Sequence, residues 1–295
     1  MEKTFVSIIV PTYKDWKRLA LCVEALSKQT YQNECFEVII VNNDSGDVMP
    51  SDFLLPHNFK LITEAKPGSY AARNAALKIA KGEIIGFTDS DCIPEKDWIK
   101  SAVDYLNDNK NCSRIAGQVL VFSDAARTTV SEKYDMIYAF PQQLYVEKGK
   151  SSVTANLFTY KAIFDAIGFF NETLLSNGDL EWGRSAQQAG YPVHFVKDVV
   201  VKHPARSLTE LIKKAKRIGG GRGMAERQWN NKLSNLFNLI NGCRPRLAEI
   251  RYIYTNATYL PAMDKIKVLF LRHYLLQVSA MERLVVQLGK QPKRA

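Results

Sequence analysis

Apolar and polar residues alternate along the first half of the chain in the manner of strands separated by helices. Between the apolar runs, apolar residues recur at helical spacing, as Leu19, Val23 and Leu26 do. This alternation predicts an α/β fold with a mostly parallel, doubly wound sheet, which binds ligands at the carboxyl ends of its strands. The runs typical of buried strands lie at residues 4–12, 36–41, 59–62, 84–87 and 115–122.

The second half of the chain continues this pattern and then loses its strands. Two more strands are predicted at residues 154–160 and 193–201. Ser207 and Glu210 form a capping box that opens a basic helix, and the glycines of residues 219–223 are expected to break it. From about residue 232 only helical periodicity remains. We therefore predict an α/β domain over residues 1–217 and a helical C-terminal extension over residues 218–295.

The apolar stripe in the C-terminal extension leaves two interpretations open. Leu271, Leu275 and Val278 share one side of a helix, which would pack on the α/β domain or on a second copy of the chain in a homodimer. Alternatively, the helix lies on a membrane surface. A basic and aromatic segment keeps this option open; it contains Arg244, Arg246, Arg251, Tyr252 and Tyr254.

Composition and charge narrow the class of protein. With 295 residues, of which 46% are hydrophobic, the chain buries a substantial core and is not disordered as a whole. Its formal charge of +10 favours an anionic partner, either a nucleotide, a nucleic acid or an anionic membrane surface. The first apolar run is short and ends at Pro11, so we do not expect a signal peptide, and no uncharged apolar stretch is long enough to span a bilayer.

The cysteines favour a reducing compartment. There are five of them, an odd number, and no two form a Cys-x-x-Cys pair. This pattern argues against both a disulfide framework and a zinc site. We therefore expect a cytoplasmic protein, with the inner membrane face as a second place of contact.

Two carboxylates at the end of a buried strand are the first candidate for chemistry. Asp89 and Asp91 follow the apolar run 84–87 and are separated by Ser90. Successive side chains on a strand point to opposite faces, so both carboxylates reach one ligand only if the backbone turns at Ser90. An isolated Asp-x-Asp is most often a solvated turn, and on these residues alone that interpretation stays open.

Six motifs that follow one another along the chain make a functional site the preferred interpretation over a solvated turn. They are VSIIVPTYKDW, EVIIVNNDS, KPGSYAARNAAL, IIGFTDSDCIP, NGDLEWGRSAQQAGY and VVVKHPARSL. From about Phe5 to Arg217 they resemble glycosyltransferase family 2. The resemblance implies a GT-A (Rossmann-like) fold and an inverting, metal-dependent enzyme. Such an enzyme moves a hexose or N-acetylhexosamine from a nucleotide-sugar donor, with UDP expected, to a hydroxyl of a glycan or lipid-linked glycan acceptor.

The resemblance also implies which residues hold the metal and the nucleotide. Asp91 would bind the ion and His203 would complete its shell. Carboxylate, imidazole and phosphate ligands suit Mn²⁺, with Mg²⁺ as the alternative. Lys14 departs from the family pattern, and so does the pair Asn42-Asn43, whose amides leave the choice between uridine and other nucleosides open. The implied nucleotide-binding residues are Pro11, Thr12, Tyr13, Asp15, Asn42, Asn43, Lys66, Arg73, Asp89 and Ser90.

The residues for the transfer step come from later motifs. Asp179 matches the acidic residue that takes the proton of the acceptor hydroxyl, and Glu181 is the alternative. Trp182 and Trp98 either stack on the acceptor sugar or pack in the core. Asn156 resembles an Asn beneath the donor sugar.

Two rival functions remain open from the sequence. A sugar-phosphate nucleotidyltransferase also places acidic residues around a metal, but it opens with a glycine-rich phosphate loop, and the corresponding PTYKDW has no glycine. A non-enzymatic protein would bind nucleic acid or an anionic surface through its basic segments. No nucleic-acid module is visible, so we expect no nucleic-acid partner.

Overall fold

The computed structural model describes residues 4–126, 128–174, 176–226 and 247–291. The chain divides into two compact units. Unit 1 is Met1–Leu120 with Phe140–His203, and unit 2 is Val121–Ala139 with Pro204–Ala295. The predicted division into residues 1–217 and 218–295 stays a prediction, although one continuous helix, α8 (Leu208–Glu226), runs through its boundary.

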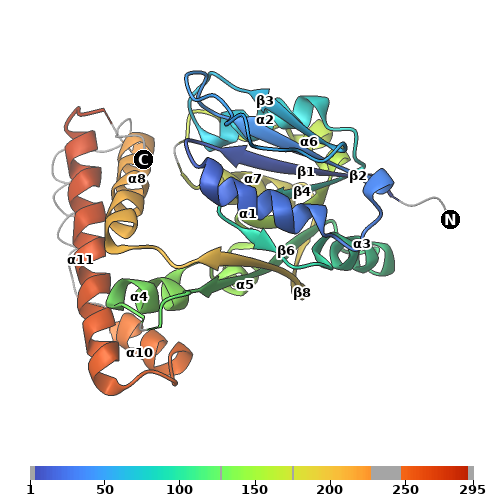
Figure 1. Cartoon of the computed structure of the whole chain (residues 1–295). Coiled ribbons are helices and arrows are strands. Elements are labelled where there is room, and N and C mark those ends of the chain that lie inside the picture. Colours follow the sequence, from blue (N-terminus) through green and yellow to red (C-terminus); the bar gives the residue numbers. More distant parts are fainter. Residues whose placement is uncertain (1–3, 127, 175, 227–246, 292–295) are drawn as a thin grey trace. The chain divides into compact units, whose positions relative to one another are not determined.

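Four parallel strands form one half of an eight-stranded sheet (Figure 1). They are β1 (Val6–Thr12), β2 (Phe36–Asn42), β3 (Phe59–Thr63) and β4 (Ile84–Thr88), in the order β3-β2-β1-β4. Every residue of β1, β2 and β4 is buried, which explains why these strands are apolar without alternation. The predicted α/β fold is therefore confirmed.

The other half of the sheet begins with antiparallel pairing. Strand β7 (Asn156–Tyr160) runs antiparallel to β4, and β6 (Arg114–Phe122) runs antiparallel to β7. The long strand β8 (Val193–Pro204) follows, with the short β5 (Ile93–Pro94) paired antiparallel at the edge. Because β7 is antiparallel to β4, its first residues lie beside the last residues of β4.

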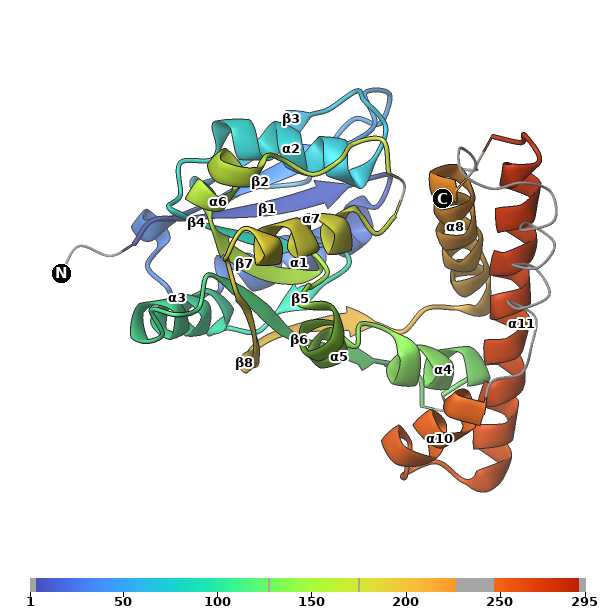
Figure 2. The same ribbon diagram turned by 180° about the vertical axis from the view of Figure 1, so that it is seen from behind.

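Helices cover both faces of the sheet and enclose two cores (Figure 1, Figure 2). Helices α1 (Trp16–Ser27) and α3 (Trp98–Asp108) bury one core, whereas α2 (Ser69–Ile79), α6 (Lys161–Ile167) and α7 (Gly178–Gln188) bury the other. Ile8 and Ile9 of β1 belong to opposite cores, as the two-residue period of a strand requires. A short turn η1 (Asn33–Cys35) and helix α5 (Gln142–Gly149) complete unit 1.

The described part of unit 2 is mostly helical. Helices α4 (Val130–Tyr138), α8, α10 (Leu247–Asn256) and α11 (Ala262–Gln287) share a core that includes Tyr134, Leu211, Ile253 and Val268. The predicted capping box opens α8, since the Ser207 backbone N–H donates to the Glu210 carboxylate at 2.8 Å.

The glycines of residues 219–223 do not break α8, which corrects the expectation from the sequence. A Cβ on Gly219 would lie 2.2 Å from the backbone oxygen of Ser279, and one on Gly223 would lie 2.7 Å from that of Arg283. Both oxygens belong to α11. The glycines therefore allow α8 and α11 to pack backbone against backbone, and this packing outweighs the cost of about 1 kcal/mol that each glycine imposes on a helix.

Helix α11 is apolar on two sides. Val268 and Leu275 face the core of unit 2, while large apolar side chains on the other side are exposed to solvent, with Phe270 at 72%. None of the helices in the described ranges has the length and apolar content needed to cross a bilayer. Arg244, Arg246 and Cys243 fall outside the described residues, and the other four cysteines are free thiols. The exposed side chains are Met263, Ile266, Phe270, Tyr274 and Met281.

Candidate active site

The predicted site residues of the early motifs meet at one edge of the sheet in unit 1. Thr12 and Asn42 are register partners at the ends of the parallel strands β1 and β2. Thr88, at the end of β4, is the register partner of Asn156 at the start of β7. Ligand binding is expected at this edge, because the carboxyl ends of the parallel strands lie there.

The backbone turns directly after β4. The Cys92 N–H donates to the backbone oxygen of Asp89 at 3.0 Å, which closes a turn over Ser90 and Asp91. The two carboxylates then find different partners. Arg73 Nη2 lies 2.5 Å from Asp89 Oδ1, whereas His203 Nε2 lies 3.1 Å from Asp91 Oδ2.

Asp91 and His203 are brought together by strand pairing. The register of β5 and β8 places Ile93 opposite Lys202, so the residues just outside this pair lie close to each other. The His203 ring is buried and lies 4.8 Å from the ring of Phe140, while Asp91 keeps partial exposure. Strand pairing and an aromatic contact therefore fix the position of the imidazole, and the carboxylate beside it is partly exposed to solvent.

The donor set fits a divalent ion that is shared with a ligand. One carboxylate and one imidazole suit Mn²⁺ or Mg²⁺. Within the part of the chain that the structure describes, no three His, Cys, Asp or Glu residues are grouped so that they could hold a metal. If an ion were bound here, Asp91 and His203 would hold it as two protein ligands, and its other ligands would have to come from a bound molecule or water.

Arg73 is a buried cation beside this site. Its side chain is 4% exposed, projects from α2 and lies with its guanidinium carbon 5.8 Å from the centre of the Tyr70 ring. Its Nε has no hydrogen-bond partner among the described residues. The ion pair with Asp89 thus leaves a donor of Arg73 unused.

The residues at the end of β1 and just after it differ in exposure and in their contacts. The Thr12 hydroxyl is buried and has no partner among the described residues, whereas the Tyr13 ring is exposed. Lys14 adopts a left-handed conformation with φ 53° and pairs with Asp44 at 3.1 Å. Asp15 caps α1 by accepting from the Arg18 N–H at 3.3 Å. Nucleotide contacts of Pro11, Thr12, Tyr13 and Asp15 stay predictions.

The amides of Asn42 and Asn43 are bonded to the protein. Asn42 accepts from the Asp44 N–H at 3.1 Å and donates to the backbone oxygen of Asp47. Asn43 donates to the backbone oxygens of Glu64 and Lys66 and accepts from the Gly68 N–H, each at 2.8 Å. Both side chains therefore brace the loops at the sheet edge, and their departure from the family pattern has a structural use.

Lys66 lies on the surface and pairs with Glu172. Glu172 also accepts from Asn74 of α2 at 2.9 Å, which ties residues 170–172 to α2. Neither Glu172 nor Asn74 stands out in the sequence, because the two residues are far apart in the chain. The predicted role of Lys66 at the nucleotide is not tested by these contacts.

Asp179 is a buried carboxylate with three donors. It is 9% exposed and accepts from the Tyr70 hydroxyl and the Leu180 N–H at 3.0 Å each, on Oδ1, and from the Thr154 N–H at 3.2 Å, on Oδ2. Burial raises its pKa above that of an ordinary carboxyl, and the nearby Arg73 charge and these hydrogen bonds oppose the rise. Glu181, the alternative base, is exposed.

The three residues predicted at the sugar, Trp98, Trp182 and Asn156, are buried. Trp98 is fully buried and donates to Asn156 Oδ1 at 2.9 Å, and Trp182 stacks on Phe164 with 4.4 Å between ring centres. Asn156 is 0% exposed and donates to the backbone oxygens of Gln118 and Val199. Both tryptophans therefore pack in the core, and Asn156 connects strands through buried hydrogen bonds, while the sugar contacts of these three residues stay predictions.

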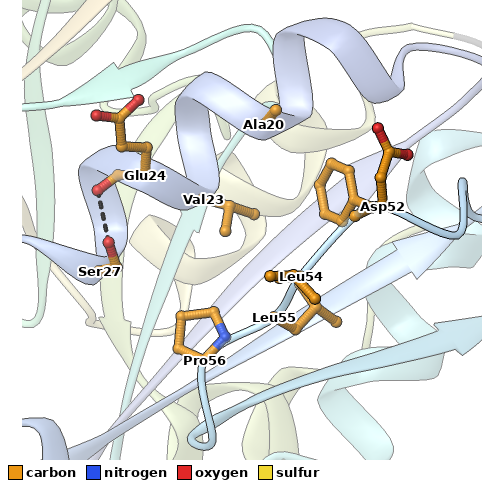
Figure 3. A pocket seen from close by; sticks show the side chains of 9 residues that line it. Ala20, Val23, Glu24, Ser27, Asp52, Leu54, Leu55 and Pro56 are labelled. Carbon is orange, nitrogen blue, oxygen red and sulfur yellow. Dashed lines mark hydrogen bonds between the residues drawn. The ribbon is translucent and has the colours of Figure 1, made fainter.

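A hollow of about 480 Å³ lies elsewhere on unit 1 (Figure 3). Helix α1 contributes Ala20, Val23, Glu24 and Ser27, and residues 52–56 form the opposite side. None of these residues belongs to the predicted site. The strand-end site is therefore defined by its side chains and not by this hollow.

Comparison with known proteins identifies the family. Residues 7–168 match the model of the family described as Glycosyl transferase family 2. The chain belongs to this family. It is 33% identical to the glycosyltransferase AglE of Haloferax volcanii over 222 residues, which cover 74% of this chain and 72% of that protein. The chain is therefore a glycosyltransferase, and the nucleotidyltransferase and the non-enzymatic binding protein are set aside.

Two more distant proteins are also similar to this chain. A dolichyl N-acetyl-alpha-D-glucosaminyl phosphate 3-beta-D-2,3-diacetamido-2,3-dideoxy-beta-D-glucuronosyltransferase of Methanococcus voltae is 23% identical over 239 residues, covering 76% of this chain and 74% of that protein. The mannosyltransferase PcManGT of Pyrobaculum calidifontis, solved in complex with GDP-Man and Mn²⁺, aligns with a TM-score of 0.55 at 19% identity. That alignment covers 99% of this chain and 78% of the other and confirms the GT-A fold.

Proposed function

We propose that this glycosyltransferase is metal-dependent and inverting. It moves a hexose or N-acetylhexosamine from a nucleotide sugar to a hydroxyl of a glycan or lipid-linked glycan. The observation that carries this proposal is the contact of 3.1 Å between Asp91 Oδ2 and His203 Nε2 beside the turn after β4. A carboxylate and an imidazole so placed would hold Mn²⁺ or Mg²⁺, and that ion would neutralise charge on the leaving diphosphate.

The residues around the ion have separate tasks in this proposal. Asp89 and Ser90 face the ribose or a water on the ion, and Arg73 holds the Asp89 carboxylate. Tyr13, exposed after β1, meets the base. The expected base is uracil, and guanine is the alternative because the similar mannosyltransferase was solved with GDP-Man.

Asp179 is the base of the transfer step in this proposal. Inversion requires that the acceptor hydroxyl attacks the anomeric carbon from the face opposite the nucleotide while a base removes its proton. Burial raises the pKa of Asp179, which makes its carboxylate a stronger base than an exposed one. The carboxylate is active only when deprotonated, so activity is lost as the pH falls through this raised pKa.

The acceptor is proposed to be held at a membrane surface. Exposed apolar and aromatic side chains line α11, and the chain carries a formal charge of +10, which suits an anionic bilayer. The similar Methanococcus voltae enzyme is named for a dolichyl-linked substrate, which supports a lipid-linked acceptor. We therefore propose a peripheral protein at the cytoplasmic membrane face.

Calorimetric titration tests the metal and nucleotide together. UDP and GDP are titrated into the whole chain with and without Mn²⁺, beside Asp91→Asn and His203→Gln. We expect Mn²⁺ to strengthen binding of one nucleotide, and each variant to lose most of that gain. Lys60→Gln is the control, because it removes an ion pair with Glu37 in unit 1 that involves none of the site residues. Equal affinity with and without Mn²⁺ in the folded wild type would contradict the proposal.

A further inference from the structure

We propose that Tyr70 is the positioning residue of the base, which holds Asp179 so that its Oδ2 meets the acceptor hydroxyl. This inference rests on the proposed role of Asp179 and gives a role to Tyr70, which lies in the motif KPGSYAARNAAL but was assigned none from the sequence. Tyr70 and Asp179 are 109 residues apart in the chain, so their contact is invisible in the sequence.

The Tyr70 hydroxyl joins two consecutive residues at the start of α7. It donates to Asp179 Oδ1 at 3.0 Å and accepts from the Gly178 N–H at 2.9 Å. Asn177, the residue before the helix, makes no side-chain cap. Tyr70 therefore takes the place of the cap, and the same hydroxyl that orders the first turn of α7 also orients the carboxylate.

The Tyr70 ring is itself held in place. It lies 5.7 Å from the ring of Phe170, and a Cβ on Gly178 would come within 2.8 Å of it. Tyr70 is 5% exposed. This close approach requires a glycine at residue 178. The Tyr70 ring therefore packs directly against the backbone at the start of α7.

The hydrogen bonds distinguish the two oxygens of Asp179. Oδ1 receives two donors, the Tyr70 hydroxyl and the Leu180 N–H. Oδ2 receives one, the Thr154 N–H, at the longer distance of 3.2 Å. A carboxylate oxygen accepts about two hydrogen bonds, so Oδ2 keeps a lone pair for the acceptor hydroxyl, whereas Oδ1 is fully used.

Helix α2, which carries Tyr70, also carries a residue that contacts the proposed nucleotide side of the site. Arg73 lies one turn after Tyr70 on α2 and pairs with Asp89, while its guanidinium packs over the Tyr70 ring. Two side chains of one helix thus fix the base and the first aspartate of the Asp-x-Asp turn. Helix α2 sets the spacing between the acceptor side and the nucleotide side.

The test is Tyr70→Phe in the whole chain, because this change removes the hydroxyl and keeps the ring. Tyr31→Phe is the matched control, since it removes a buried hydroxyl that donates to the backbone oxygen of Thr4 at 2.5 Å, in the other core. The titration of Asp179 is followed by ¹³C NMR of the aspartate carboxyls. Its signal is assigned by its absence in Asp179→Asn, so the measurement needs no substrate.

We expect Tyr70→Phe to move the titration of Asp179 upward by about one to two pH units. The reason is that the lost hydrogen bond stabilises the carboxylate. The other groups that act on it, the Arg73 charge and the N–H groups of Thr154 and Leu180, remain. Tyr31→Phe should leave the titration where it is. An unmoved titration in Tyr70→Phe would overturn the inference.

Turnover separates this inference from the proposed function. UDP-glucose, UDP-N-acetylglucosamine and GDP-mannose serve as donors. At a pH where Asp179 is deprotonated in both the wild type and the variant, Tyr70→Phe should lower kcat about ten- to a hundredfold. KM for the donor should not change. If Asp179→Asn loses turnover but Tyr70→Phe does not, the inference fails and the proposed base stands. If Asp179→Asn keeps full turnover, the base fails and the inference fails with it.

Discussion

The side chains after β4 show why residue type alone does not fix a role. Asp89 and Asp91 are alike in the sequence, but one pairs with a buried arginine and the other with a buried histidine. The sequence could indicate a turn at Ser90, because side chains alternate along a strand and both carboxylates reach one ligand only if the backbone turns. The partners could not, since Arg73 and His203 come from distant segments whose approach depends on the fold.

Asn156 illustrates a role that only the structure reveals. Its side chain makes three hydrogen bonds inside the protein, to Trp98, Gln118 and Val199. Because each bond contributes about 1 kcal/mol, Asn156→Ala should lower the free energy of unfolding by about 3 kcal/mol, as measured by urea denaturation. Nucleotide affinity of the folded fraction should not change. Loss of affinity at unchanged stability would instead place Asn156 at the donor.

At the scale of elements, buried strands are the best predicted part of the fold. Strands β1, β2 and β4 begin and end within about two residues of the predicted runs, because burial on both faces makes them continuously apolar. The antiparallel direction of β7 was not predicted. It depends on pairings such as Thr88 with Asn156, which local sequence does not encode.

Helix α8 shows how tertiary packing overrides local preference. Its glycines suggest a break when the helix is considered alone, but α11 lies against them. We expect Gly219→Ala to lower the free energy of unfolding by about 1–3 kcal/mol, because its Cβ would overlap the backbone oxygen of Ser279.

Gly149→Ala is the matched control for that helix contact. A Cβ there meets nothing within 4 Å, so the change should be neutral or stabilise the chain by up to about 1 kcal/mol. Thermal and urea denaturation measure the free energy of unfolding of both variants. Equal stability of the two variants would show that the close approach of α8 and α11 is not required.

At the scale of the whole molecule, charge and exposed apolar area together suggest where the enzyme acts. We expect the chain to sediment with vesicles of mixed neutral and anionic phospholipid, less so at high salt. The double variant Phe270→Ser with Tyr274→Ser should reduce this binding by about tenfold or more, because it removes two exposed aromatic side chains from α11.

Leu54→Ser is the control for membrane binding, since Leu54 is 83% exposed but lies in unit 1. It should leave vesicle binding unchanged. The predicted homodimer is the competing occupant of the exposed face of α11. A dimeric mass in light scattering that the double variant converts to a monomer, with no vesicle binding in either protein, would contradict the membrane proposal and favour the dimer.

The central claim is that Asp179 drives sugar transfer at a site that binds the nucleotide through other residues. The most direct measurement compares turnover of a nucleotide sugar by the wild type and by Asp179→Asn, with nucleotide affinity measured on the same samples. We predict that turnover falls by about 10²- to 10⁴-fold while affinity stays within about twofold, because the carboxylate acts on the acceptor proton and does not hold the nucleotide. Unchanged turnover in the folded variant would contradict the account.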